Sequence, residues 1–174
     1  MEITADLLES TVTRLRYKDF ADGKVFTVGS KPRLEYAWDD GVAIGRYLKE
    51  LKQGHIMAKR CRACDRIMLP PRMFCERCWR ITDEWVPLEG TGTVNTFAVS
   101  YVDWAAGRIP KGQRPYTPAV IEIDGASQGM GILHLLDEVA PEKIFIGMRV
   151  QAVWRPEAER VGAITDIQYF KPQT

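Results

Sequence analysis

One segment near the N-terminal third carries a clear helical pattern. Its apolar residues recur at the spacing of one helical face: Ile44, Tyr47, Leu48 and Leu51. Asp39 or Asp40 can cap the start, and Gly54 is typical of the residue that follows a helix. We therefore predict a helix over residues 39–54 whose apolar face packs on the rest of the protein.

The C-terminal half has a different pattern, made of short runs rich in β-branched and aromatic residues and separated by turn residues. Five strands are expected: Thr93–Tyr101, Ala119–Ile123, Gly129–Leu135, Val150–Trp154 and Gly162–Tyr169. One helical turn is expected near Pro141–Ile144. Five short strands within about 80 residues favour a small closed barrel, and a five-stranded oligonucleotide/oligosaccharide-binding (OB) fold over residues 83–174 is the simplest choice.

Residues 1–38 are mixed in character and are predicted to form an N-terminal extension. Ala5–Leu15 is amphipathic and suggests a short helix. Lys24–Val28 and Arg33–Trp38 are separated by Gly29 and Pro32, which suggests two short strands. The expected fold class is thus mainly β with N-terminal helices.

Composition narrows the class of protein. The chain has 174 residues, of which 45% are hydrophobic and 27% charged, as expected for a soluble globular protein. No apolar run approaches the roughly 18 residues of a membrane span. The first residues carry acids where a signal peptide carries positive charge. We expect a cytoplasmic protein without a membrane anchor.

The net charge of +1 hides two segments of opposite sign. Residues 55–80 have a net charge of +5, and residues 81–174 have a net charge of −4. The basic segment also holds every cysteine of the chain. A positive patch steers anionic partners but does not identify them.

The four cysteines follow the pattern C-x2-C-x10-C-x2-C: Cys61, Cys64, Cys75 and Cys78. Two such knuckles bring four thiolates around one ion, which predicts a zinc ribbon over residues 55–82, with rubredoxin-type iron as the minor alternative. Two disulfides are the other interpretation, disfavoured by the expected cytoplasmic setting. Because four protein sulfurs fill the coordination sphere, the zinc should be structural.

The basic residues of this ribbon have two interpretations. They are Lys59, Arg60, Arg62, Arg66, Arg72, Arg77 and Arg80. Either they solvate the surface and donate to the cysteine sulfurs, or they form a site for phosphate or an acidic partner. With zinc bound, the charge of the segment falls to about +3 and stays positive.

Signals of catalysis are weak in this sequence. No cysteine lies outside the ribbon, and the two histidines, His55 and His134, have neither triad nor metal-ligand spacing. No phosphate-binding loop or dinucleotide fingerprint occurs. We predict no catalytic residue. Nucleic acid is disfavoured as a partner because the expected barrel is acidic.

Five motifs in order resemble a known family. They are residues 54–61 (GHIMAKRC), residues 68–78 (MLPPRMFCERC), residues 85–94 (WVPLEGTGTV), Pro115–Ala119 and Gly147–Val150. Together they resemble the domain-of-unknown-function 35 (DUF35) family, in which a rubredoxin-like zinc ribbon precedes an OB-fold domain. The resemblance covers about residues 39–170. Glu76 stands where the family often has proline, and the Tyr101–Arg114 loop is longer than usual.

The resemblance implies a non-catalytic accessory subunit of a thiolase-like enzyme that acts on CoA thioesters. The thiolase-like catalytic subunit would be the partner, and the acyl-CoA substrate would bind at their interface, with Arg72 near the CoA phosphates or near acidic side chains of the partner. Within the family, the chain resembles the small subunits of thiolases that cleave benzoylsuccinyl-CoA. A stand-alone acyl-CoA carrier and a single-stranded nucleic-acid-binding module are the alternatives.

Overall fold

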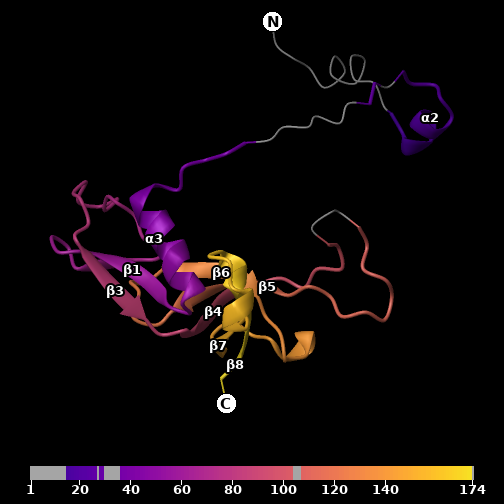
Figure 1. Ribbon diagram of the computed structural model, residues 1–174. Coiled ribbons are helices and arrows are strands. Elements are labelled where there is room, and N and C mark those ends of the chain that lie inside the picture. The colour runs from indigo at the N-terminus through magenta and orange to yellow at the C-terminus, as the bar shows by residue number, and fades with distance from the viewer. Residues whose placement is uncertain (1–14, 27, 30–35, 104–106, 174) are drawn as a thin grey trace, which may run out of the picture. The chain divides into compact units, whose positions relative to one another are not determined.

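The computed structural model describes residues 15–26, 28–29, 36–103 and 107–173. The chain divides into two compact units, Met1–Trp38 and Asp39–Thr174 (Figure 1). In the first unit the described residues form one short helix, α2 (Tyr17–Ala21), which has no buried residue. No helix in the described part of the chain is long and apolar enough to cross a membrane.

Expectations for the first unit were partly wrong. Residues 24–26, 28 and 36–38 form no strand. A strand needs a partner for its backbone groups, and no described residue of this unit supplies one. Helix α2 was not predicted, because five residues are too few for a helical period. The expected helix Ala5–Leu15 lies outside the described residues, apart from Leu15, which is not helical.

Helix α3 (Gly41–Lys52) confirms the helix predicted in the second unit. The Asp39 side chain accepts a hydrogen bond of 2.9 Å from the N–H of Gly41 at its start. Gly54, with φ 83°, adopts a left-handed conformation that favours glycine and ends the helix. Tyr47 and Leu51 are buried, so the predicted apolar face packs into the core.

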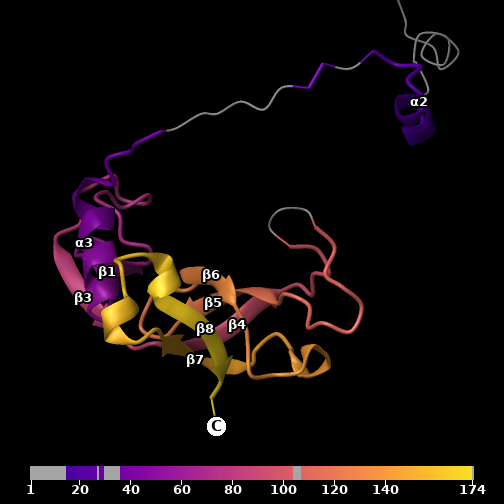
Figure 2. The same ribbon diagram turned by 45° about the vertical axis from the view of Figure 1, so that its right-hand side comes forward.

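The zinc-ribbon region forms a three-stranded antiparallel sheet of order β2-β1-β3. Its strands are β1 (Ile56–Cys61), β2 (Arg66–Met68) and β3 (Glu84–Leu88). Strand β3 follows the second pair of cysteines and pairs with β1 along its length. In both Figure 1 and Figure 2, α3 lies beside this sheet.

The second sheet has the order β6-β5-β4-β7-β8, with every neighbouring pair antiparallel. Its strands are β4 (Thr91–Phe97), β5 (Pro118–Ile123), β6 (Gly131–Leu135), β7 (Arg149–Trp154) and β8 (Ile167–Pro172). A bridge between Leu136 and Phe170 joins the two edges of this sheet. The five predicted strands are therefore present in the expected order, as an OB-type barrel.

The last strand starts later than the sequence indicates. Residues 162–166 form a loop and the 3-10 helix η3 (Ile164–Asp166) before β8 begins. The carboxylate of Asp166 is buried and accepts hydrogen bonds from the N–H groups of Val161, Gly162 and Ala163. These bonds satisfy the backbone of a turn where a strand had been expected. Two further 3-10 turns, η1 (Pro141–Lys143) and η2 (Glu157–Glu159), precede it, and η1 lies where a helical turn was expected.

Ribbon and barrel share one hydrophobic core. Met68 and Leu69 from the ribbon are fully buried in the same cluster as Ile121 and Phe170 from the barrel. The edge strand β2 also joins the β5–β6 connection, because the N–H of Ile67 donates to Ser127 Oγ at 2.9 Å. The two parts therefore pack as one compact unit.

A hairpin-like arm occupies the long loop between β4 and β5. Bridges pair Ser100 with Tyr116 and Val102 with Arg108. At the base, Arg114 donates to the carbonyl oxygen of Val139 at 2.7 Å. Both views show the arm extending away from the barrel strands (Figure 2).

Candidate metal centre

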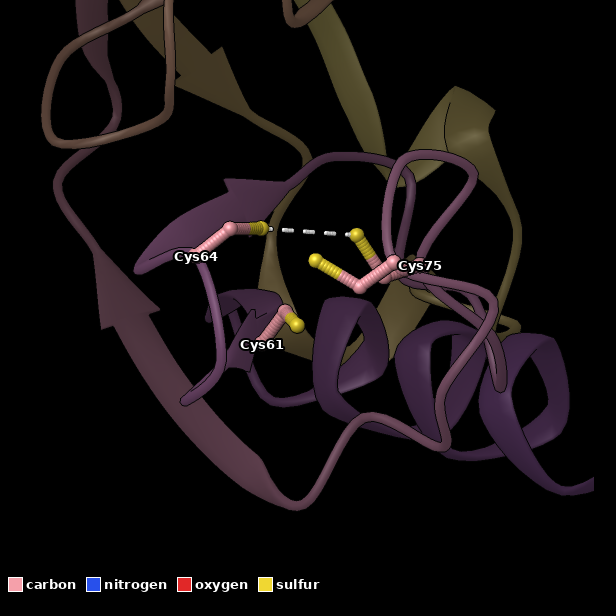
Figure 3. Close-up of side chains that lie close together, drawn as sticks. Cys61, Cys64 and Cys75 are labelled. Atoms are coloured by element: carbon pink, nitrogen blue, oxygen red, sulfur yellow. Dashed lines mark hydrogen bonds between the residues drawn. The ribbon is translucent and has the colours of Figure 1, made fainter.

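The four cysteines converge at the end of the ribbon. Cys61 ends β1, Cys64 lies in the turn to β2, and the other pair lies between β2 and β3. All four Sγ atoms lie within 4.8 Å of one another, and Figure 3 shows the Sγ of Cys64 facing that of Cys75. In the described part of the chain, this is the one group of His, Cys, Asp or Glu side chains placed to hold a metal.

The spacing of the sulfurs fits a tetrahedral zinc. Zinc–thiolate bonds of about 2.3 Å place sulfurs about 3.8 Å apart in a tetrahedron. The Sγ atoms of Cys64 and Cys75 are 3.6 Å apart, and all four cysteines are free. A disulfide would need about 2.05 Å. The sulfurs thus have the arrangement of ligands around one ion, and four thiolates leave no coordination position for water or substrate.

Backbone turns hold each pair of cysteines in place. In the second knuckle (residues 73–82), the N–H of Cys75 donates to the carbonyl oxygen of Arg80, and the N–H of Trp79 donates to that of Cys75, both at 2.9 Å. The residue after each knuckle's second cysteine has a positive φ: 57° at Asp65 and 53° at Trp79. The two knuckles therefore share a left-handed residue at the same position, which the cysteine spacing did not reveal.

The four thiols lie close together, and their pKa values differ as a result. Burial opposes ionisation of Cys75, but backbone N–H groups of Cys78 and Arg77 outweigh it and lower the pKa of Cys75 to about 7. The side-chain hydrogen bond with Cys64, together with burial, raises the pKa of Cys78 to about 12. The cluster thus resists becoming fully ionised by itself, and a bound dication supplies the charge that four thiolates need.

Glu76 connects the two knuckles through arginines. Its carboxylate lies 2.7 Å from Nε of Arg66 and 3.8 Å from Nη1 of Arg72. Arg72, the residue predicted to approach CoA phosphates, is half-exposed, and its carbonyl oxygen accepts a hydrogen bond from Thr82. The position at which the family often has proline thus holds a charged contact that the sequence did not indicate.

One of the ribbon's cations is buried. Lys59 on β1 packs its ammonium 5.0 Å from the ring centre of Trp85, and Arg46 of α3 lies 4.5 Å from the same ring. Burial lowers the pKa of Lys59, while Asp83 opposes that shift. Lys59 therefore belongs to the packing between helix and ribbon, instead of the exposed basic surface that the sequence suggested.

The two histidines lie away from the cysteines. Nδ1 of His55 lies 3.5 Å from a carboxylate oxygen of Glu50. Nε2 of His134 on β6 lies 3.3 Å from the carbonyl oxygen of Ile164, and burial lowers the pKa of this ring. Both contacts join neighbouring elements of the fold.

Two family models match consecutive parts of the chain. Residues 48–81 match the ChsH2 rubredoxin-like zinc ribbon domain, and residues 85–155 match the ChsH2 C-terminal OB-fold domain. A DUF35 domain-containing scaffold protein of Methanocaldococcus jannaschii is 32% identical over 143 residues, which are 80% of this chain and 96% of that protein. The chain belongs to the DUF35 family. The family, the zinc ribbon and the OB fold are thus confirmed.

Other relatives and solved structures have lower sequence identity to this chain. A probable enoyl-CoA hydratase alpha subunit of Thermomonospora curvata is 30% identical over 108 residues, which are 62% of this chain and about a third of that protein (32%). A solved Ltp2-ChsH2(DUF35) aldolase has a TM-score of 0.54 at 24% identity, covering 82% of this chain and 98% of that one. A DUF35 protein of unknown function from Sulfolobus solfataricus has the same TM-score at 23% identity, covering 65% and 78%. These two structures show that this DUF35 chain shares their fold.

Proposed function

We propose that this DUF35 chain is a non-catalytic accessory subunit of a thiolase-type acyltransferase complex acting on CoA thioesters. The observation that carries the proposal is the similarity to a DUF35 scaffold protein over 96% of that protein's length. The names of two further relatives, an enoyl-CoA hydratase subunit and an aldolase complex, point to partnership with enzymes. The thiolase-like catalytic subunit would supply the reactive cysteine, because all four cysteines of this chain lie in the metal cluster.

The ribbon would contribute structure to the complex. We assign Cys61, Cys64, Cys75 and Cys78 as ligands of one structural Zn2+, which would hold the two knuckles in a fixed geometry. Arg72 would approach either the CoA phosphates or acidic side chains of the partner at the interface. For the acyl group, benzoylsuccinyl-CoA is the substrate to test first.

Co-expression with a thiolase-type subunit from the same organism tests the proposal. We expect the two chains to elute together in gel filtration, with one zinc per DUF35 chain by metal analysis. Thiolytic cleavage of benzoylsuccinyl-CoA by the complex should exceed that of the thiolase-type subunit alone. Separate elution together with full activity of the lone thiolase-type subunit would contradict the proposal.

Arg72→Ala separates the two roles offered for this residue. If Arg72 contacts CoA phosphates, KM for the CoA thioester should rise while the subunits still elute together. If it contacts the partner, assembly should weaken at an unchanged KM in the fully assembled complex. Arg108→Ala, in the arm, is the matched control, because Arg108 is also an exposed arginine.

The structure gives little support to the alternative of a stand-alone acyl-CoA carrier. Its barrel interior is filled by fully buried side chains that include Val94, Ile121, Val150 and Phe170. The apolar recesses near β6, of about 270 and 250 Å³, are lined partly by Leu133, which is largely exposed. The accessory-subunit proposal is therefore preferred. Retention of the isolated chain by single-stranded nucleic acid at low salt would support the remaining alternative.

A further inference from the structure

Three large apolar side chains are exposed on the second knuckle. Phe74, Trp79 and Ile81 are 59%, 83% and 63% exposed, and we name them the knuckle patch. Phe74 and Ile81 face each other in an antiparallel bridge, so their side chains project from the same face. Trp79 lies two residues before Ile81 in the same turn. The three residues lie within one turn of eight residues, and exposed apolar groups gathered in one place mark interaction sites more often than scattered ones do.

Trp79 occupies a backbone conformation that disfavours it. Its φ of 53° lies in the left-handed region, where a bulky side chain costs about 1 kcal/mol or more relative to glycine. Most of its indole ring is exposed, so packing within the chain does not explain a tryptophan here. The positive φ belongs to the knuckle turn, since Asp65 has it as well, so the feature left to explain is the choice of an exposed tryptophan at this position.

Unpaired cations flank the patch. Arg77 and Arg80 are exposed, and neither forms an ion pair within the part of the chain that the structure describes. Glu76, which precedes Arg77, is already shared by Arg66 and Arg72. Asp83, the acid nearest to Arg80 in sequence, lies 3.8 Å from Nε of Arg62. The knuckle patch is thus an apolar tip with free positive charge beside it.

We propose that the knuckle patch docks into an apolar pocket, rimmed by carboxylates, on the thiolase-type catalytic subunit. Carboxylates of the partner complement the free charges of Arg77 and Arg80, while aromatic and aliphatic side chains fill the pocket, as at the centres of protein interfaces. This inference rests on the proposed function, because it assigns a docking surface to the partner named there.

The geometry favours a protein partner over the CoA nucleotide. Small-molecule sites are concave and enclose most of the ligand. The side chains of the knuckle patch instead project into solvent, at exposures of 59% to 83%. A projecting apolar tip can be enclosed by a pocket on a partner protein. It cannot itself enclose a nucleotide, which would stay exposed to solvent on one side.

The test uses the full chain, co-expressed with the thiolase-type subunit from the same organism. Trp79→Gly removes the indole and relieves the positive φ, so zinc content and thermal stability should stay equal or rise. Ile81→Ser removes a second apolar contact. Val161→Ser is its matched control, since Val161 is an aliphatic residue outside the knuckle that is also largely exposed, at 74%. Arg77→Glu reverses one flanking charge.

We expect Trp79→Gly and Ile81→Ser to weaken assembly roughly tenfold or more, and Val161→Ser to leave it unchanged. Arg77→Glu should slow association and reduce its salt dependence. Unchanged assembly of both patch variants would overturn the inference and leave the proposed function standing. Separate elution of the unmodified chain, together with full activity of the lone thiolase-type subunit, would refute both.

Two further results would also overturn the inference. One is saturable quenching of tryptophan fluorescence by CoA in the isolated chain that is lost in Trp79→Phe, which would make the patch a nucleotide site. The other is a concentration-dependent dimer of the isolated chain that Trp79→Gly abolishes, which would make a second copy the occupant.

Discussion

Arg66 at the start of β2 and Glu76 inside the second knuckle form an ion pair of 2.7 Å. The contact joins the two halves of the metal centre independently of the sulfurs. The Arg66 side chain is only 14% exposed, so its guanidinium is held in a partly desolvated position where an opposite charge counts for more than at the surface.

Glu76→Gln should therefore weaken the metal centre. Removing the carboxylate charge leaves Arg66 poorly compensated, and we expect a loss of about 1–2 kcal/mol in the free energy of unfolding. Zinc should also transfer faster to a competing chelator. The control is Glu84→Gln, which removes a partner of the mostly exposed Arg62 and should cost less than about 0.5 kcal/mol.

Loss of zinc should affect the knuckles more than the strands beside them. In Cys64→Ser one thiolate is lost and the site should release its metal. Hydrogen exchange should then increase in residues 62–66 and 73–82, while β1 stays protected because Ile56 and Ala58 are buried in the shared core. Equal loss of protection in β4 and β5 would show that the metal supports the whole unit.

Gly92 lies where any larger residue should disrupt the barrel. A Cβ at this position would lie 2.3 Å from the carbonyl oxygen of Glu122 on the paired strand β5. We expect Gly92→Ala to destabilise the protein by about 2–4 kcal/mol in denaturant unfolding. Gly45→Ala is the matched control. Nothing lies within 4 Å of its added Cβ in helix α3, so it should stabilise by up to about 1 kcal/mol.

Asp166→Asn should destabilise the turn before β8. Burial opposes ionisation of Asp166, but three backbone N–H donors outweigh it and lower the pKa of this carboxyl. An amide accepts these bonds less well, and we expect a cost of about 2 kcal/mol at pH 7 in thermal or denaturant unfolding. Glu157→Gln, an exposed acid in the nearby turn η2, should have little effect.

The effect of Asp166→Asn should depend on pH. Because the folded pKa lies below the unfolded value of about 4, the carboxylate stabilises the fold above that value. This stabilisation disappears as pH falls through the lower, folded pKa. The difference between the unmodified chain and Asp166→Asn should therefore narrow below about pH 4. A constant difference down to pH 2 would show that the charge of Asp166 does not matter.

The local sequence pattern was sufficient to predict several parts of this DUF35 chain. The spacing of apolar residues predicted α3, and the runs of β-branched residues predicted the five barrel strands. Cysteine spacing predicted a cluster in which all sulfurs lie within 4.8 Å. Each of these signals is carried by residues close in sequence, where periodicity and chelate spacing act directly.

Other features depend on contacts between distant segments. Residues 84–88 lie in the range predicted for the OB fold, yet they form β3 of the ribbon sheet. This strand pairs with the edge of β1 that β2 leaves free. The start of β8 was misplaced because the buried Asp166 gathers the N–H groups of a turn. No periodicity signals such a carboxylate, since its burial depends on the elements that cover it.

By itself, the sequence determined the class of this protein: a helix, a four-cysteine ribbon and a five-stranded barrel, with positive charge concentrated in the ribbon. Tertiary structure alone decided which of those charges remain free. It buries Lys59 beside Trp85, and it joins Arg66 and Arg72 to Glu76. It leaves Arg77 and Arg80 in solvent beside the exposed indole of Trp79. Charge is a property of each residue, but whether a charge is neutralised depends on distances that only the folded chain sets.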